Sequence, residues 1–118
     1  MRKGFVSFGR TWYAVIDMEH GEPPKQQSRW RVILSGAVQH VGLRYTALYL
    51  CRELKLTGWV MNLPDGRVTL EIQGDLTDLR RFLVRIKSQP PIHIAHAAIQ
   101  PLPLEVGERG FRVRRYGE

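Results

Sequence analysis

The chain has 118 residues, of which 43% are hydrophobic and 25% charged, a composition typical of one globular domain and unlike that of a disordered or fibrous protein. Its formal net charge of +7 favours anionic partners, either nucleic acid, phosphorylated metabolites or an acidic membrane surface, without choosing among them. The single cysteine, Cys51, excludes an intrachain disulfide, and no apolar run is long enough to span a bilayer. We therefore expect a cytoplasmic protein with no membrane partner.

The first 29 residues differ in pattern from the rest of the chain. Residues 5–8 and 11–16 could form two short strands, and residues 21–28 are typical of a linker because proline, glycine and polar residues dominate them. A partly disordered extension is the alternative, and the sequence does not separate the two. We expect an N-terminal extension over 1–29 and a single domain over 30–118.

Regular periodicity begins at Trp30. A run of β-branched and aliphatic residues over 31–35 predicts a strand. Apolar residues then recur at helical spacing and predict a helix over about 43–56, with Gly58 as its stop signal. A second strand is expected over 59–62, before a tight turn.

The second half of this domain repeats the alternation of strand and helix. Residues 67–73 alternate between apolar and polar and predict a strand. Asp75 is a plausible N-cap for a second helix, which Pro90-Pro91 ends. Residues 92–99 and 111–114 are the remaining strand candidates. The order is β-α-β-β-α-β with a terminal strand, which predicts an α+β, ferredoxin-like sandwich with two helices on one face of an antiparallel sheet.

The segment that joins the first strand to the first helix has features of an anion site. Such a loop presents unpaired backbone N–H groups at a helix N-terminus, where the helix dipole also favours negative charge. Gly42 allows close approach of the backbone, and Arg44 can direct a planar fork of donors at two phosphate oxygens. A loop of this kind with one arginine is common, so this segment alone is a weak signal.

A second segment places Asn62 at the end of a strand, beside the turn Leu63-Pro64-Asp65-Gly66. An asparagine there can accept a hydrogen bond from water while donating another, which suits the orientation of a nucleophile. It can equally cap its own turn, a frequent structural role.

Together the two segments resemble the paired signatures of the acylphosphatase family. The family pattern Gly-x-Val-Gln-Gly-Val-Gly-x-Arg matches residues 36–44 with one departure, and Gly-Trp-Val-x-Asn-x-x-Asp-Gly-x-Val matches residues 58–68 without any. The resemblance extends from about Trp30 to Tyr116. Two linked motifs on a compatible fold are a specific signal, and they imply hydrolysis of small acyl phosphates to carboxylate and phosphate.

The resemblance also implies which residues act. Family members hold the phosphate with loop amides and an arginine, which here means Arg44 and the backbone of residues 39–44. These residues are Gln39, His40, Val41, Gly42, Leu43 and Arg44. The family asparagine that orients water for in-line attack corresponds to Asn62. The resemblance implies no cofactor and no metal, and inorganic phosphate as both product and competitive inhibitor. We expect a monomer, although nothing in the sequence specifies the oligomeric state.

The departure is His40, which stands where the family has glycine. If that glycine uses a positive φ, histidine can adopt the same conformation at some cost. The imidazole could point into solvent, crowd the anion, or donate an extra hydrogen bond to substrate. The sequence leaves these outcomes open, and they concern activity rather than fold.

Other classes of function fit the sequence less well. A cysteine-dependent phosphatase needs Cys-x5-Arg, and Val38 occupies the position of the thiol. The histidines are too scattered for a metal site. A basic ferredoxin-like module that binds nucleic acid is the alternative from another class, with the arginines of the second helix as its phosphate contacts. An acylphosphatase-like domain that binds anions without catalysis is a further one. We do not expect nucleic acid to be a partner of this protein.

Overall fold

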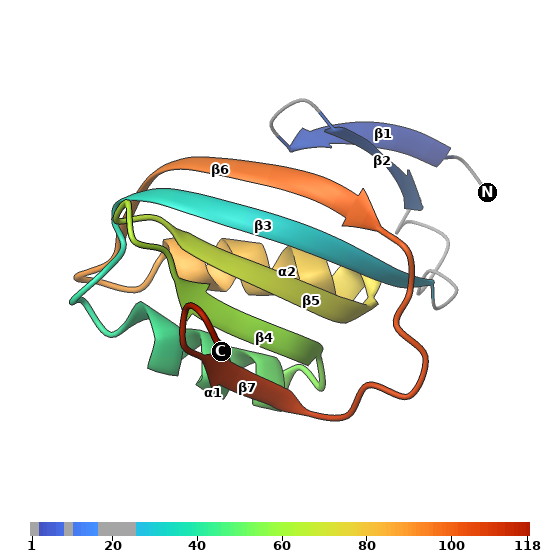
Figure 1. Ribbon diagram of the computed structural model, residues 1–118. Coiled ribbons are helices and arrows are strands. Elements are labelled where there is room, and N and C mark those ends of the chain that lie inside the picture. Colours follow the sequence, from blue (N-terminus) through green and yellow to red (C-terminus); the bar gives the residue numbers. More distant parts are fainter. Residues whose placement is uncertain (1–2, 9–10, 17–25) are drawn as a thin grey trace.

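A computed structural model describes residues 3–8, 11–16 and 26–118 of the chain (Figure 1). The first two ranges form strands β1 (Lys3–Phe8) and β2 (Thr11–Ile16), which pair with each other in an antiparallel two-stranded sheet. Of the expected linker, residues 21–25 lie outside the described residues. The boundary of the N-terminal extension stays a prediction.

The remainder of the described chain folds into a five-stranded sheet and two helices. The helices are α1 (Leu43–Glu53) and α2 (Leu76–Lys87). The strands are β3 (Gln27–Ala37), β4 (Thr57–Asn62), β5 (Val68–Asp75), β6 (His93–Leu102) and β7 (Phe111–Arg114). Their order is β6-β3-β5-β4-β7, and every neighbouring pair is antiparallel except β4 with β7. Both helices cover the same face of the sheet, so the ferredoxin-like α+β sandwich is confirmed (Figure 1). The sheet is mixed rather than wholly antiparallel as predicted, because the terminal strand β7 runs parallel to β4.

The hydrophobic core lies between this sheet and the two helices. On β3 the alternate residues Trp30, Val32 and Leu34 are each at most 1% exposed, as the period of two along a strand requires. The helices contribute Leu43, Ala47, Leu50, Leu79, Phe82 and Ile86 to the same core. Cys51 also lies in the core, where burial raises the pKa of its thiol, so it is a packing residue and not a nucleophile.

Helix α1 ends three residues before the predicted boundary. Lys55 adopts a left-handed backbone with φ 58°, and the N–H of Leu56 donates to the carbonyl of Cys51 at 2.8 Å, which closes the last turn. Leu56 then packs into the core outside the helix. The expectation that Gly58 stops the helix was therefore wrong, because Lys55 takes the conformation usually left to glycine.

The strands extend further than the sequence pattern suggested. Strand β3 begins at Gln27 rather than Arg31, so the last residues of the expected linker belong to the sheet. Asp75 precedes α2 as predicted, but its carboxylate accepts a hydrogen bond from the backbone N–H of Gln26 at 3.3 Å and caps no helical N–H. The strands gain these residues because pairing between backbones continues beyond the alternating apolar segments.

Candidate active site

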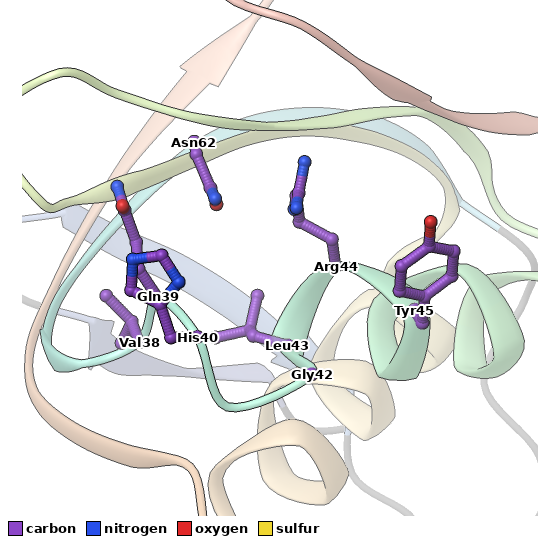
Figure 2. A pocket seen from close by; sticks show the side chains of 8 residues that line it. All are labelled: Val38, Gln39, His40, Gly42, Leu43, Arg44, Tyr45 and Asn62. Atoms are coloured by element: carbon purple, nitrogen blue, oxygen red, sulfur yellow. The ribbon is translucent and has the colours of Figure 1, made fainter.

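The loop after β3, the first turn of α1 and the end of β4 surround a cavity of about 160 Å³ (Figure 2). Its lining residues are Val38, Gln39, His40, Gly42, Leu43, Arg44, Tyr45 and Asn62. The two predicted segments therefore meet, and of the residues expected in the site only Val41 is absent from the lining, because its side chain packs against the core. Tyr45 is a lining residue that the sequence reasoning did not single out.

The first turn of α1 presents unpaired backbone donors to this cavity. Gly42 is the N-cap residue, has a left-handed backbone with φ 78°, and lacks a side chain that could cap the helix. The N–H groups of residues 42–45 have no intrahelical acceptor, as in any first helical turn, and no other described residue accepts from them. A Cβ at residue 42 would meet no atom within 4 Å, so glycine is needed there for its φ and not for space. The helix dipole adds positive potential at the same place.

His40 occupies a second left-handed position in this loop, with φ 61°. The residue that replaces the family glycine therefore has the positive φ that favours glycine. Histidine adopts this region several times more often than most residues, and the exposed imidazole of His40 contacts no described residue through a hydrogen bond. The backbone of the loop can thus take its course with histidine present.

Gln39 ties the loop to the turn that follows β4. Its side-chain amide donates to the backbone carbonyls of Leu63 at 2.8 Å and Arg67 at 2.9 Å. The same turn is closed by a hydrogen bond from the N–H of Leu63 to the carbonyl of Arg67 at 2.8 Å. Because Leu63 directly follows Asn62, these bonds fix the position of Asn62 relative to the loop. No local pattern in the sequence indicates this link, since both acceptors are backbone atoms far along the chain.

Arg44 and Asn62 enter the cavity from different elements. Figure 2 shows the guanidinium of Arg44, from α1, and the amide of Asn62, from β4, directed into the same hollow. Arg44 forms no hydrogen bond or ion pair with any residue of the described chain, and the Oδ1 atom of Asn62 is buried with no hydrogen-bond partner there. A buried acceptor without a donor is costly, which makes Oδ1 a place for a water or ligand proton. The cavity thus combines cationic donors with one unsatisfied acceptor.

The lining carries no carboxylate and no thiol. Within the described ranges, no three His, Cys, Asp or Glu side chains lie close enough together to hold a metal ion. No helix in the described part of the chain is long and apolar enough to cross a membrane.

The basic surface of α2 is partly neutralised. Arg81 pairs with Asp78 at 3.1 Å, and Arg85 pairs with Glu53 of α1 at 3.0 Å. These pairs occupy two of the arginines that a nucleic-acid-binding module would use for phosphates. The cavity at the head of α1, whose arginine is unpaired among the described residues, is therefore the stronger candidate for an anion site. Fold and cavity define a ferredoxin-like α+β domain with a candidate anion site where β3 leads into α1.

Comparisons with known proteins agree with this class. The acylphosphatase family profile matches residues 30–113. The acylphosphatase of Nostoc sp. is 37% identical over 99 residues, which cover 83% of this chain and 97% of that protein. The acylphosphatase of Geobacillus kaustophilus is 37% identical over 86 residues, which cover 72% and 92% respectively.

Solved structures give the same result. The acylphosphatase from Bacillus subtilis superposes with a TM-score of 0.70 at 30% identity and covers 74% of this chain and 98% of its own. An acylphosphatase from Coxiella burnetii gives a TM-score of 0.71 at 28% identity, with 79% and 100% covered. The chain therefore belongs to the acylphosphatase family, and its function is that of an acylphosphatase, a hydrolase of acyl phosphates.

Proposed function

We propose that Arg44 and the backbone N–H groups of residues 39–44 hold the phosphoryl group of a small acyl phosphate, and that Asn62 orients the attacking water. The observation that carries this proposal is the meeting of an unpaired guanidinium, free helix N–H groups and the unsatisfied Oδ1 of Asn62 in one cavity. The donors suit phosphate oxygens, and the acceptor suits a water proton.

The reaction assigned to these residues is an in-line displacement at phosphorus. Arg44 and the backbone N–H groups of residues 39–44, together called the phosphate cradle, fix the phosphoryl oxygens. Water donates a hydrogen bond to Asn62 Oδ1, and this bond directs an oxygen lone pair of the water at phosphorus. A bond forms between the water oxygen and phosphorus as the bond from phosphorus to the acyl oxygen breaks. The carboxylate leaves with that electron pair, and the water proton passes to a phosphate oxygen or to solvent. Arg44 and the amides offset the negative charge that spreads over the phosphoryl oxygens.

Two further properties follow from this chemistry. A carboxylate is a weak base and leaves without a strong general acid, which agrees with a lining that has no acidic side chain. The positive charge of the cradle takes the part that a metal ion takes in other phosphoryl-transfer sites, so we propose a reaction that needs no metal or other cofactor. Inorganic phosphate fits the same donors as the substrate, and we expect it to compete with substrate as well as to be the product.

The remaining expectations concern the molecule around the site. Residues 30–118 contain every lining residue of the cavity, which supports the proposal that this part of the chain carries the catalytic site. Since one chain supplies the whole lining, we propose a monomer. A single cysteine, buried in the core, is consistent with the reducing cytoplasm as its location.

The test of this function is the hydrolysis of benzoyl phosphate, followed by ultraviolet absorbance in the presence of EDTA. We expect turnover by the wild-type protein and its competitive inhibition by inorganic phosphate. His40→Gly should turn over at a rate within about threefold of the wild type, because glycine keeps the left-handed backbone that His40 has now.

Other outcomes separate the alternatives. Activity only in His40→Gly would mean that the imidazole spoils the cradle and that the natural chain binds anions without catalysis. Absence of turnover in both proteins would contradict the roles given to Arg44 and Asn62. Binding of an RNA oligonucleotide that weakens steeply with salt would then favour the basic nucleic-acid-binding module.

A further inference from the structure

The side chain of His40 lines the cavity without a partner of its own. It is exposed, and its ring forms no hydrogen bond or ion pair with a described residue. The backbone φ of 61° is open to glycine at no steric cost, whereas a residue with a Cβ takes it at some cost. No polar contact of the ring within the described chain offsets that cost. A backbone held in a sparsely populated region beside a binding site points to a role for the side chain that it carries.

The cavity has His40 on one side and Arg44 on the other. Figure 2 shows the imidazole of His40 and the guanidinium of Arg44 on opposite sides of the hollow, with the amide of Asn62 directed between them. An anion that lies against the guanidinium and the first-turn N–H groups of α1 therefore has the imidazole along its other side.

We propose that the protonated imidazole of His40 is a second cationic contact for the phosphoryl group, so that the enzyme binds a tetrahedral dianion more tightly as the pH falls from 8 to 5.5. This inference rests on the proposed function, because it takes the position of the phosphoryl group from it. Imidazole is the side chain that ordinarily gains its proton in this range. Its charged form has two N–H donors and forms charge-assisted hydrogen bonds with phosphoryl oxygens, whereas its neutral form has one donor and no charge. A bound dianion favours the charged form, so binding takes up a proton and the affinity rises as the pH falls.

The other titratable and charged groups on the described elements around the cavity come from α1, the turn after β4, the start of β6 and the chain after β7. Carboxylates ordinarily lose their protons below pH 5.5, and guanidinium and phenol groups keep theirs above pH 8. Among these groups, a second histidine is therefore the one that could imitate His40. The groups are Arg44, Tyr45, Asp65, Arg67, His93, Arg115 and Glu118.

The experiment measures the binding of inorganic sulfate by calorimetry at pH 5.5 and pH 8, at constant ionic strength. Sulfate remains a tetrahedral dianion at both pH values, whereas inorganic phosphate changes its own charge between them. His40→Asn removes the charge and keeps a residue that takes the left-handed conformation readily. His40→Lys makes the charge permanent, and Lys55 shows that lysine takes this conformation in the same chain, with φ 58°. His93→Gln is the matched control, because His93 pairs with Ala37 at the start of the same loop.

We expect the wild-type protein to bind sulfate about fivefold more tightly at pH 5.5 than at pH 8, the upper range for an exposed ion pair. His40→Asn should have nearly equal, weak affinities at the two pH values, and His40→Lys should have the tighter affinity at both. His93→Gln should keep the wild-type ratio. An effect of this size leaves His40→Gly within the threefold range expected of its turnover near pH 7, where an ordinary imidazole is mostly neutral. A wild-type ratio of one, or an unchanged fivefold ratio in His40→Asn, would overturn the inference.

Hydrolysis of benzoyl phosphate by the same proteins keeps this result separate from the fate of the proposed function. If the wild-type protein hydrolysed benzoyl phosphate while His40→Asn kept the wild-type ratio for sulfate, the contact from His40 would fail and the catalytic roles would stand. If the wild-type protein hydrolysed nothing while the ratio depended on His40, the catalytic roles would fail and the contact would stand. Absence of sulfate binding by the wild-type protein at both pH values would contradict the phosphate cradle and the contact from His40 together.

Discussion

Two arginines of the chain, Arg29 and Arg44, lie in opposite electrostatic surroundings. The side chain of Arg29 is 2% exposed and binds Glu71 at 3.1 Å, Glu108 at 2.7 Å and Gln73 at 3.2 Å. Arg44 faces the cavity and pairs with none of the described residues. A guanidinium with its donors used holds strands together, whereas one with its donors free can bind an anion. The position of the partner carboxylates, more than the arginine itself, separates a structural site from a functional one.

The charges around Arg29 stabilise one another. Burial alone would lower the pKa of Arg29, but hydrogen bonds to Glu108 and Glu71 and the charges of these carboxylates raise it overall. Burial likewise would raise the pKa of Glu108, but the hydrogen bond from Arg29, a second from Thr57 and the nearby positive charges lower it overall. The pair links β3 to the segment before β7 and is charged at neutral pH.

The largest expected effect is the loss of activity when Arg44 is removed. Arg44→Ala should lower kcat/KM for benzoyl phosphate by about 10³-fold or more, because the transition state loses its cationic donor, and should weaken phosphate binding at the same time. Its free energy of unfolding should stay within about 0.5 kcal/mol of the wild type, since no described residue loses a partner. Steady-state kinetics and urea unfolding measure the two effects. If inorganic phosphate inhibited Arg44→Ala as strongly as it inhibits the wild type, Arg44 would not be part of the phosphate-binding site.

Removal of Arg29 is expected to do the reverse, lowering stability while leaving activity intact. Arg29→Met should lower the free energy of unfolding by about 3 to 5 kcal/mol, because Glu71 and Glu108 would be left without their partner in a largely buried place. Activity per folded molecule should be retained. Arg29→Met combined with Glu108→Gln is the control and should recover part of the loss. If Arg29→Met unfolded at the same urea concentration as the wild type, the cluster would not be structural.

Acidification should weaken the cluster around Arg29. The pKa of Glu108 is lower in the folded than in the unfolded chain, so its contribution to stability is fully present above its unfolded value of about 4.3 and is lost as the pH falls through the folded value. Glu108→Gln should lower the free energy of unfolding at pH 7 by about 1.5 to 3 kcal/mol, the range for one charge-assisted hydrogen bond. It should also flatten the fall of stability below pH 4.3. Equal slopes in wild type and variant, measured by urea unfolding across pH, would argue against this assignment.

The sequence predicted the features that depend on local patterns. Apolar spacing located both helices, and the two motifs placed Asn62 and Arg44 in one site because the fold brings the end of β4 to the start of α1. The cluster around Arg29 was not predicted, since its carboxylates lie 42 and 79 residues away and carry no local signal. The link from Gln39 to Leu63 and Arg67 was missed for the same reason.

The backbone conformation of individual residues could also not be predicted from the sequence. Nothing in the composition near Lys55 indicated that a lysine would take the left-handed conformation that ends α1. Tyr45 lies on the exposed side of α1, where sequence patterns place solvated residues, so its position in the lining of the cavity needed the structure.

The most direct test of the account is to measure phosphate binding and turnover together in Asn62→Ala. Calorimetric titration with inorganic phosphate should give a Kd within about twofold of the wild type, because the cradle keeps Arg44 and its amides. The kcat for benzoyl phosphate should fall by about 10²- to 10³-fold, the usual cost of one positioning hydrogen bond in a site of this kind. An unchanged kcat, or a loss of phosphate affinity as large as that in Arg44→Ala, would contradict the separation of the cavity into a cradle for phosphate and an acceptor for water.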